Sequence, residues 1–399
     1  MTPNTSEPYS YDVVVIGGGN AGLSAAARCR KKGIDSVAVI EPQSVHTYRP
    51  LLSYVGGGQA RLPSAQRGQA QVTPRGVTWL QDSAVSVDAA SNTVTCASGM
   101  TVTYRDLIVG PGLVPDHDAL PGIDAALATE SVASNYLDEA TRTWYLTRTV
   151  RDGGHAVFTV PRPPVSCTGT TVKPLFLAAA HWASIGRSVR TTLVVDREGI
   201  VGVPDLDVRL ESALRELGVT VLRRTAVTAL HPDRKAIQVT GPGGAETLDY
   251  DMLHLVPPYR GRAWVTESGL AGDAPHGLVD IDARTLQHRR YANIWAAGDG
   301  AAIDTDPSGG GLRKQVATLV DNLLAARRGD ELGEYDGYTV APIPVDAHRL
   351  IAAEFDRTGT ITSSIPSFLD PLKPRRLAWA GDRYGLPFSY WHLLLKGHL

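Results

Sequence analysis

The sequence has 399 residues, of which 43% are hydrophobic and 20% charged, and its formal net charge is −2. This composition is typical of a globular chain of about two or three domains, and the near-zero charge argues against nucleic acid as a main partner. The three cysteines form no CxxC or CxxxxC pair, so neither a metal site nor a local redox disulfide is predicted. The polar start predicts no signal peptide, and the lack of an apolar run near about 18 residues predicts no spanning helix. The default expectation is a cytoplasmic protein, either free or at the cytoplasmic face of a membrane.

The first patterned stretch spans residues 13–41. An apolar, β-branched run leads into the motif GxGxxG, then into helix formers over 21–32, and then into a second apolar run that ends on Glu41. This order is typical of a dinucleotide-binding βαβ unit. The first glycine makes the turn, the second admits the pyrophosphate at the helix N-terminus, the third lets the helix lie close to the strand, and the acid binds ribose hydroxyls. The predicted cofactor residues here are Gly17, Gly19, Asn20, Ala21, Gly22 and Glu41.

The loop that follows Glu41 is rich in turn formers and aromatic residues. Its position suits a segment that runs along a bound dinucleotide. His46, Tyr48 and Arg49 either contact the cofactor or substrate, or are ordinary surface and packing residues; we include Arg49 in the predicted site.

An antiparallel meander is predicted over 77–112, because apolar and polar residues alternate there and Asn92 and Gly99 mark turns. Cys96 falls on one of its strands and is expected to pack rather than react. The last run ends in Gly-Pro-Gly, which we expect at the adenine side of the cofactor. The meander therefore adds Ala84, Gly110 and Gly112 to the predicted site.

A second apolar strand is predicted over 155–160, but no GxGxxG motif follows it. Prolines and Cys167 occupy that position instead, which argues against a conventional nicotinamide site. Further strands at 192–196 and 220–222, with a helix at 207–217 between them, indicate a dinucleotide-type domain without its nucleotide. Cys167 precedes a helix expected near Pro174. This position would lower the thiol pKa and favour a thiolate nucleophile, with a structural role as the alternative.

Near the end of the chain, an apolar strand at 294–297 runs into Gly298 and Asp299. An acid there suits a ribityl hydroxyl, and this late motif combined with Glu41 favours bound FAD over NAD. Gly310 lies in a glycine-rich run before a helix whose N-terminus would stabilise negative charge on the reduced flavin. The tail at 386–399 is apolar but too short to span a bilayer. It either lies on a membrane or docks on the protein's own core.

The chain resembles the sulfide:quinone oxidoreductase family, and specifically its mitochondrial-type branch. The segments that carry this resemblance are VVVIGGGNAGLSAAAR, HTYRPLLSYVGGG, PRPPVSCTGTTVK, DMLHLVPP, TLQHRRYANIWAAGD, YDGYTVAPI, AAEFD and LPFSYWHLLLKG. The resemblance implies an α/β fold of tandem Rossmann-like domains, non-covalent FAD, and a C-terminal region that meets a membrane and a quinone. The expected domains are residues 10–118 with 278–330 for FAD, 119–277 for the Cys167 domain, and 331–399 for the C-terminal region.

The resemblance also implies two redox cysteines beside the flavin. Cys167 matches the first, but the second falls at Ala341, and the family's cysteine after Gly-Asp is Gly300. A lysine expected before the flavin-facing helix is Pro307. These departures cluster at the redox site, so a disulfide between two active-site cysteines is impossible within one chain.

The sequence therefore predicts an FAD-dependent oxidoreductase that oxidises sulfide or a small thiol through Cys167 and passes electrons to a quinone or another acceptor. Two alternatives remain: a flavoenzyme of the same fold that oxidises a different organic substrate, and a flavin-binding redox sensor with little turnover. The sequence does not define the oligomeric state.

Overall fold

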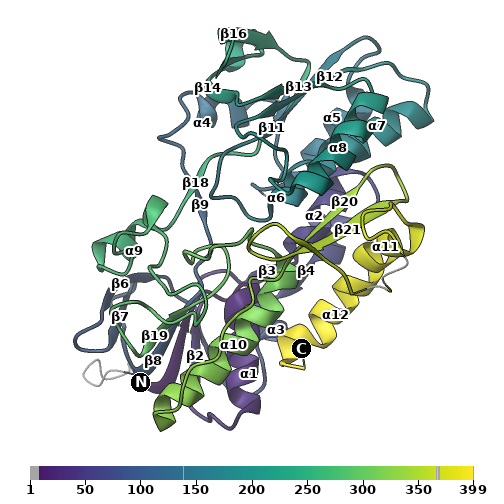
Figure 1. Ribbon diagram of the computed structural model, residues 1–399. Helices are drawn as coiled ribbons and strands as arrows, with labels where there is room; N and C mark the ends of the chain where they lie inside the picture. The colour runs from purple at the N-terminus through teal and green to yellow at the C-terminus, as the bar shows by residue number, and fades with distance from the viewer. Residues whose placement is uncertain (1–8, 138, 365, 367–368, 399) are drawn as a thin grey trace.

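The computed structural model describes residues 9–137, 139–364, 366 and 369–398. Figure 1 shows two sheet-based halves, one above the other, with the C-terminal segment running from their junction down one side of the lower half. The short antiparallel pair β9 (Val114–Pro115) and β18 (Tyr259–Arg260) carries the chain between the halves. The predicted tandem arrangement is confirmed.

The lower half is built on a mixed sheet in the order β5-β2-β1-β8-β7-β6, with β19 also paired to β8. Its central strands are almost fully buried, which explains their continuous apolar runs. The long helix α10 packs against α1 beside this sheet. The elements of this half are β1 (Tyr9–Ile16), α1 (Asn20–Lys31), β2 (Val37–Ile40), β3 (Val45–Thr47), η1 (Arg49–Leu51), α2 (Leu52–Gly56), η2 (Leu62–Ala65), β4 (Gln66–Gly68), α3 (Gln69–Val72), β5 (Val77–Leu80), β6 (Ala84–Asp88), β7 (Thr93–Cys96), β8 (Thr101–Val109), α9 (Ala263–Glu267), η4 (Pro275–Gly277), β19 (Ile294–Ala296) and α10 (Gly309–Arg328).

The predicted meander over 77–112 is partly wrong. Strands β6, β7 and β8 do form antiparallel pairs, with turns at Asn92 and Gly99. However, β5 pairs in parallel with β2 at the other edge of the sheet. Alternation of apolar residues predicts a half-buried strand but does not identify its neighbour, so β5 could not be separated from the meander by pattern alone.

The upper half contains a five-stranded parallel sheet in the order β10-β17-β11-β12-β13, together with a small antiparallel sheet, β14-β15-β16. Helices α5, α7 and α8 lie beside the parallel sheet. The helix expected near Pro174 begins as the short α6, directly after Cys167, and continues as α7. The elements of this half are α4 (Ile123–Leu127), β10 (Val132–Ala133), α5 (Ala140–Thr149), β11 (His155–Val160), α6 (Thr168–Thr171), α7 (Lys173–Ser184), β12 (Arg190–Val195), α8 (Pro204–Glu216), β13 (Thr220–Arg223), β14 (Ala226–His231), η3 (Pro232–Arg234), β15 (Ala236–Gly241), β16 (Gly244–Asp249) and β17 (Met252–His254).

The C-terminal segment first forms a small antiparallel sheet and then a run of short helices that passes α7 and ends against α1. No helix among the described residues is both long and apolar enough to cross a bilayer. The elements are β20 (Thr339–Pro344), β21 (Leu350–Phe355), β22 (Ile361–Thr362), α11 (Arg376–Ala380), the π-helical turn η5 (Gly381–Gly385), α12 (Leu386–His392) and η6 (Leu394–Lys396).

The tail is docked on the core on one side and exposed on the other. Tyr390, Leu394 and Leu395 are buried, whereas Leu386 and Phe388 are 48% and 62% exposed. The docking alternative is confirmed for the face that bears Tyr390, Leu394 and Leu395, whereas contact of the exposed face with a membrane stays a prediction.

A buried ion pair joins the tail to both halves. Lys173 Nζ on α7 lies 3.1 Å from Asp382 Oδ2 in η5, and the two side chains are 1% and 4% exposed. Tyr54 on α2 donates a hydrogen bond of 2.6 Å to the same carboxylate oxygen. Three segments that are distant in the sequence thus meet at one carboxylate.

Replacing Asp382 by Asn should destabilise the protein by about 3–5 kcal/mol, because Lys173 would remain as a buried charge without a counter-charge. The measurement is the shift of the urea unfolding midpoint. Asp370→Asn is the matched control, since Asp370 pairs with Arg209 at the surface; its cost should stay below about 1 kcal/mol. Equal shifts for the two variants would contradict the expectation.

Candidate functional site

The glycine motif forms a close-packed turn with one open position. Gly17 has a φ of +99°, and a Cβ on Gly22 would lie 1.8 Å from the Gly17 carbonyl oxygen. Gly22 is therefore needed for α1 to approach β1. A Cβ on Gly19, in contrast, would meet nothing within 4 Å. The predicted pyrophosphate position is thus an open cradle at the start of α1, where N–H groups and the helix dipole favour an anion.

Glu41, at the end of β2, faces this turn. Its carboxylate accepts hydrogen bonds from the backbone N–H of Gly18 (2.7 Å) and of Gln43 (2.8 Å). The acid is therefore held beside the glycine turn, where the expected ribose would lie.

The other predicted glycines gather around the same turn. A Cβ on Gly17 would strike the Gly110 carbonyl oxygen, and a Cβ on Gly300 would lie 2.7 Å from that of Gly112. A Cβ on Gly298 would lie 3.2 Å from the Ala21 side chain. The loops after β1, β8 and β19 thus border one cradle, in which backbone excludes a side chain at Gly17 and at Gly300. Such a glycine-walled cradle fits a dinucleotide.

The N-terminus of α10 reaches the cradle as predicted. Ser308 caps this 20-residue helix by accepting a hydrogen bond from Gly311 N–H at 2.9 Å. A Cβ on Gly309 would come within 3.8 Å of the Asn20 side chain, whereas Gly310 packs closely against Val340.

Two of the remaining predicted cofactor residues have different surroundings. Arg49 donates a hydrogen bond of 3.2 Å to the Tyr136 carbonyl oxygen and lies near Asp299. Burial raises the pKa of Asp299, which a hydrogen bond from Ser166 and the charge of Arg49 partly offset. Ala84 lies on β6, opposite Cys96, and none of its described contacts connects it to the cradle. Its contact with the cofactor stays a prediction.

His46 is a buried link between the cradle and the tail. Its Nδ1 lies 3.0 Å from the Gly18 carbonyl oxygen, and its Nε2 lies 2.5 Å from the Tyr390 hydroxyl. Burial lowers the His46 pKa, so the ring is neutral, with Nδ1–H donating to Gly18 and Nε2 accepting from Tyr390. The sequence had left His46 open between a cofactor role and a packing role.

Cys167 is half-buried and has a φ of +56° at the start of α6. The expectation of a lowered thiol pKa is wrong: burial, and after it the negative charge of Asp306, raises the pKa of Cys167 to about 11. A four-residue helix offers little dipole to oppose this desolvation. The other two cysteines are buried, and burial raises the pKa of Cys96, on β7, to about 11. Cys96 is thus a packing residue, as predicted.

Asp306 and Arg197 were not identified from the sequence, yet both lie beside Cys167. Asp306 accepts hydrogen bonds from the Thr168 N–H, at 3.1 Å, and from the Thr168 hydroxyl. Arg197 Nη1 donates to the same hydroxyl at 2.9 Å. Asp306 directly precedes Pro307, one of the departures from the family pattern. This position was the sequence signal that could have identified Asp306.

Ala341, which stands where the resemblance expects a second cysteine, does approach the Cys167 segment. It is fully buried on β20, and a Cβ on Gly169 would lie 2.7 Å from its Cβ. The two matched segments therefore converge, although one of them has no sulfur.

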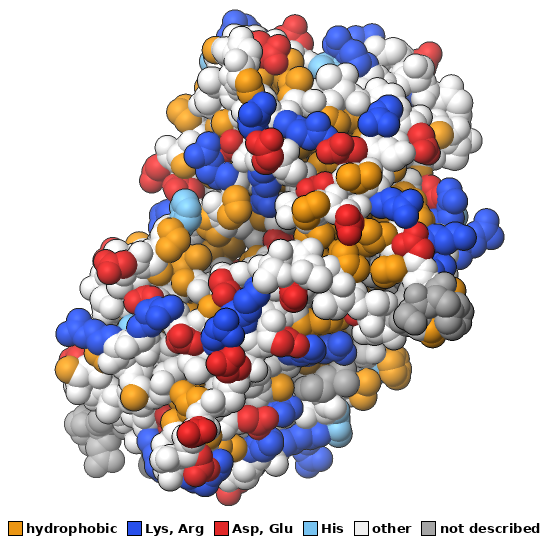
Figure 2. Space-filling model, in the orientation of Figure 1, with side chains coloured by type: hydrophobic (Ala, Val, Ile, Leu, Met, Phe, Trp, Pro, Cys, Tyr) orange, Lys and Arg blue, Asp and Glu red, His pale blue; other side chains and the backbone are white. Residues whose placement is uncertain are grey.

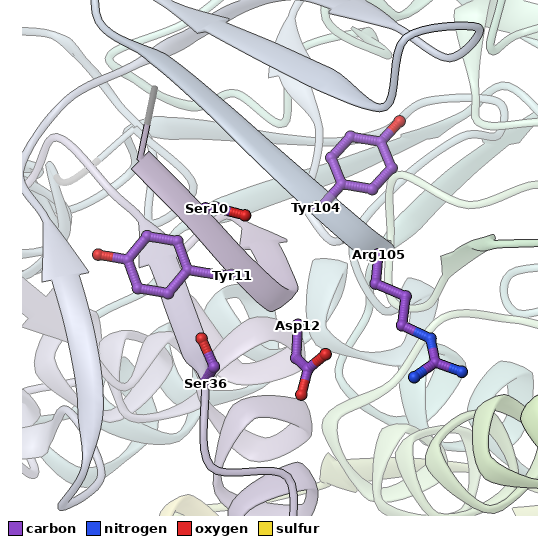
Figure 3. A pocket seen from close by; sticks show the side chains of 6 residues that line it. All are labelled: Ser10, Tyr11, Asp12, Ser36, Tyr104 and Arg105. Atoms are coloured by element: carbon purple, nitrogen blue, oxygen red, sulfur yellow. The ribbon is translucent and has the colours of Figure 1, made fainter. Parts of the chain in front are cut away.

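A separate hollow of about 430 Å³ lies at the other end of the first sheet, near the start of β1 and away from the glycine cradle (Figure 3). It is wide open to solvent, and its side chains come from the start of β1, the middle of β8 and the turn before β2. They are Ser10, Tyr11, Asp12, Ser36, Tyr104 and Arg105. In parallel-sheet folds ligands bind beyond the carboxyl ends of the strands, so this hollow is not the candidate active site.

Two glycine variants test the cradle. Gly19→Val should yield protein without flavin but with an unchanged unfolding midpoint of the flavin-free form, because its side chain enters the open cradle. Gly22→Ala should lose flavin and also about 1–3 kcal/mol of stability, because its methyl group meets backbone. Flavin absorbance and thermal unfolding measure the two effects, and Gly19→Val protein that retains flavin would contradict the assignment.

Comparisons with known proteins agree with this geometry. The family model described as pyridine nucleotide-disulphide oxidoreductase matches residues 11–322. The mitochondrial sulfide:quinone oxidoreductase of Mus musculus is 30% identical over 396 residues, which cover 97% of this chain and 87% of that protein.

Two solved structures have the same fold at 17% identity. A chain in the cryo-EM structure of the Tetrahymena thermophila mitochondrial ATP synthase has a TM-score of 0.84, with coverage of 100% of this chain and 99% of that chain. The sulfide:quinone oxidoreductase of Aquifex aeolicus has a TM-score of 0.82, with coverage of 98% and 92%.

The expected FAD-dependent oxidoreductase class is confirmed, and FAD is the cofactor that the cradle fits. The chain belongs to the pyridine nucleotide-disulphide oxidoreductase family and, within it, to the sulfide:quinone oxidoreductases.

Proposed function

We propose that the protein oxidises sulfide or a small thiol through Cys167 and passes the electrons to a quinone. The observation that carries this proposal is that the residue after Cys167 is hydrogen-bonded to the loop that follows the Gly-Asp motif. The Thr168 N–H donates to Asp306 at 3.1 Å, and the side chain of Ser166, the residue before Cys167, lies near Asp299. Cys167 is therefore held between the upper half of the molecule and the end of the cofactor-binding motif.

FAD, when bound, supplies the acceptor for two electrons. The protein's own contribution is to hold the Cys167 sulfur at the cradle and to limit the access of water to it, since the thiol is half-buried. The N-terminus of α10 adds the positive end of its helix dipole at the cradle. The helix dipole favours negative charge on the cofactor. The Cys167 thiol reacts only when it is deprotonated.

With Ala341 on β20, the sulfur taken up by Cys167 has no second cysteine to receive it. A small thiol from solution would accept this sulfur instead. Its reaction is bimolecular and so lacks the large effective concentration of a neighbouring group in the same chain.

The raised pKa of Cys167 and the missing second cysteine favour one alternative, a flavoprotein that binds FAD but turns over slowly as a redox sensor. A flavoenzyme of the same fold that oxidises a different organic substrate is the other alternative. Both predict that sulfide has little effect on the flavin.

The test is the rate of anaerobic flavin reduction by sulfide in the wild type, Cys167→Ser, Ala341→Cys and the double variant. We expect Ala341→Cys to raise the rate, because the exchange becomes intramolecular, and Cys167→Ser to lower it in both backgrounds. NADH and NADPH should reduce the flavin poorly, because Pro161 to Thr170 replaces the second glycine loop. An unchanged rate in Cys167→Ser would make Cys167 structural and favour the organic-substrate alternative.

A membrane surface is the proposed source of the quinone. Apolar side chains on the outer face of the C-terminal helices are exposed: Leu377 (83%), Tyr384 (59%), Leu386 (48%) and Phe388 (62%). Figure 2 shows hydrophobic side chains beside Lys and Arg side chains along the edge where these helices lie. This combination suits shallow insertion next to anionic headgroups.

Leu377→Gln combined with Phe388→Gln should weaken co-sedimentation with vesicles of phosphatidylcholine and phosphatidylglycerol, at about 25 cal/mol for each Å² of apolar area withdrawn from lipid. Val208→Gln is the matched control, because Val208 is 66% exposed on α8 in the upper half. Equal sedimentation of all three proteins would rule out this surface as the membrane contact.

A further inference from the structure

The loop after β19 contains a carboxylate whose position neither the cofactor cradle nor the tail requires. The Asp306 carboxylate accepts hydrogen bonds from the N–H and from the hydroxyl of Thr168, the residue after Cys167. The backbone of Asp306 is fixed as well, because its carbonyl oxygen accepts a hydrogen bond of 2.6 Å from the Thr339 hydroxyl on β20. The carboxyl group is therefore held in place against the start of α6.

Arg197 completes the arrangement from the end of β12. Its Nη1 donates to the Thr168 hydroxyl, and its Nε donates to the Pro161 carbonyl oxygen, both at 2.9 Å. Its Nη2 is shielded from solvent and has no hydrogen-bond partner among the described residues. The guanidinium thus supports the segment before Cys167 and the residue after it, and places a positive charge close to Asp306.

A tyrosine closes the same region. Tyr136 is 8% exposed, and its hydroxyl has no hydrogen-bond partner among the described residues. The ionisable groups near it include Cys167, Asp306 and Asp299. A buried hydroxyl is normally hydrogen-bonded. The unpaired Tyr136 hydroxyl near the thiol therefore points to a position where a substrate atom or a water molecule binds.

We propose that Asp306 is the proton acceptor and positioning residue for Cys167, held in place by Thr168 and Arg197. This assignment rests on the proposed function for the role of Cys167. In the step, the S–H bond breaks, its electron pair stays on sulfur, and the proton moves to a carboxylate oxygen of Asp306. No oxidant or further reactant is needed for this step.

The electrostatics of the region agree with that role. Burial raises the pKa of Asp306 to about 6, so the carboxylate is ionised and able to take a proton at neutral pH. In return, its negative charge contributes, after burial, to the raised pKa of Cys167. The other charged and titratable groups near Asp306 and Cys167 are Arg49, Tyr136, Lys173, Arg197 and Asp299.

The test compares two readouts that a merely structural role would move in the same direction. Asp306→Asn should speed alkylation of Cys167 by iodoacetamide below about pH 9, about tenfold for each unit by which the thiol pKa falls, because a nearby negative charge is removed. The same variant should slow flavin reduction by 2-mercaptoethanol about 100-fold at pH 7, because the proton acceptor is lost.

The pH profile gives the decisive signature. The 2-mercaptoethanol thiol stays protonated between about pH 5 and about pH 8, so any break in this range belongs to the protein. The wild-type rate should fall as the pH drops through about 6, and Asp306→Asn should lose that break. Thr168→Val, which removes one of the hydrogen bonds that lower the Asp306 pKa, should move the break upward.

Asp306→Glu and Asp304→Asn are the controls. The first keeps a carboxylate and should recover part of the rate; the second removes a carboxylate that pairs with Arg357 and should change neither readout. The proposal fails if Asp306→Asn slows both reactions equally or keeps the break near pH 6. If no thiol reduces the flavin in any variant while the alkylation shift is still seen, the pairing of Asp306 with Cys167 stands and the proposed function fails.

Discussion

The structure depends on one buried charge that must be matched. Lys173 is enclosed between α7 and the C-terminal segment, and an unpaired ammonium there would cost several kcal/mol in desolvation. Asp382 supplies the opposite charge from a π-helical turn, a local widening of the helix that is often found at functional positions. Tyr54 then fixes the carboxylate from the lower half. The pair of Lys173 and Asp382 therefore ties the tail to both halves, at a position six residues after Cys167.

The second constraint is that glycines, which have no side chain, line the flavin cradle. The flavin cradle is formed where the loops after three parallel strands meet; a Cβ on Gly17, Gly22 or Gly300 would collide with backbone there, whereas Gly19 stays open. In the upper half the corresponding loop contains prolines and Cys167. The lower half thus provides an open cradle for a nucleotide, whereas the upper half places Cys167 in the corresponding loop, although both are built on the same strand and helix pattern.

The sequence predicts the parts of the site that depend on local spacing. The GxGxxG turn, Glu41 and the Gly-Asp motif each follow a buried strand, so their geometry is set by residues next to them. Asp306 and Arg197 could not be found this way, because α6 and the loop at 304–308 are 138 residues apart and meet only after folding. The thiol pKa failed for a related reason: a helix start is visible in the sequence, whereas burial and a distant carboxylate are not.

The link through His46 has a consequence for how the two ends of the molecule communicate. The Tyr390 hydroxyl on α12 reaches the Gly18 carbonyl through one imidazole ring, so the last helix supports the loop that would hold the diphosphate. Any ligand that draws α12 away from the core breaks this chain of bonds and weakens the hold on the flavin. Linkage is reciprocal, so a bound flavin must resist that ligand by the same factor. Displacement of α12 from the core and release of the cofactor are therefore two sides of one equilibrium.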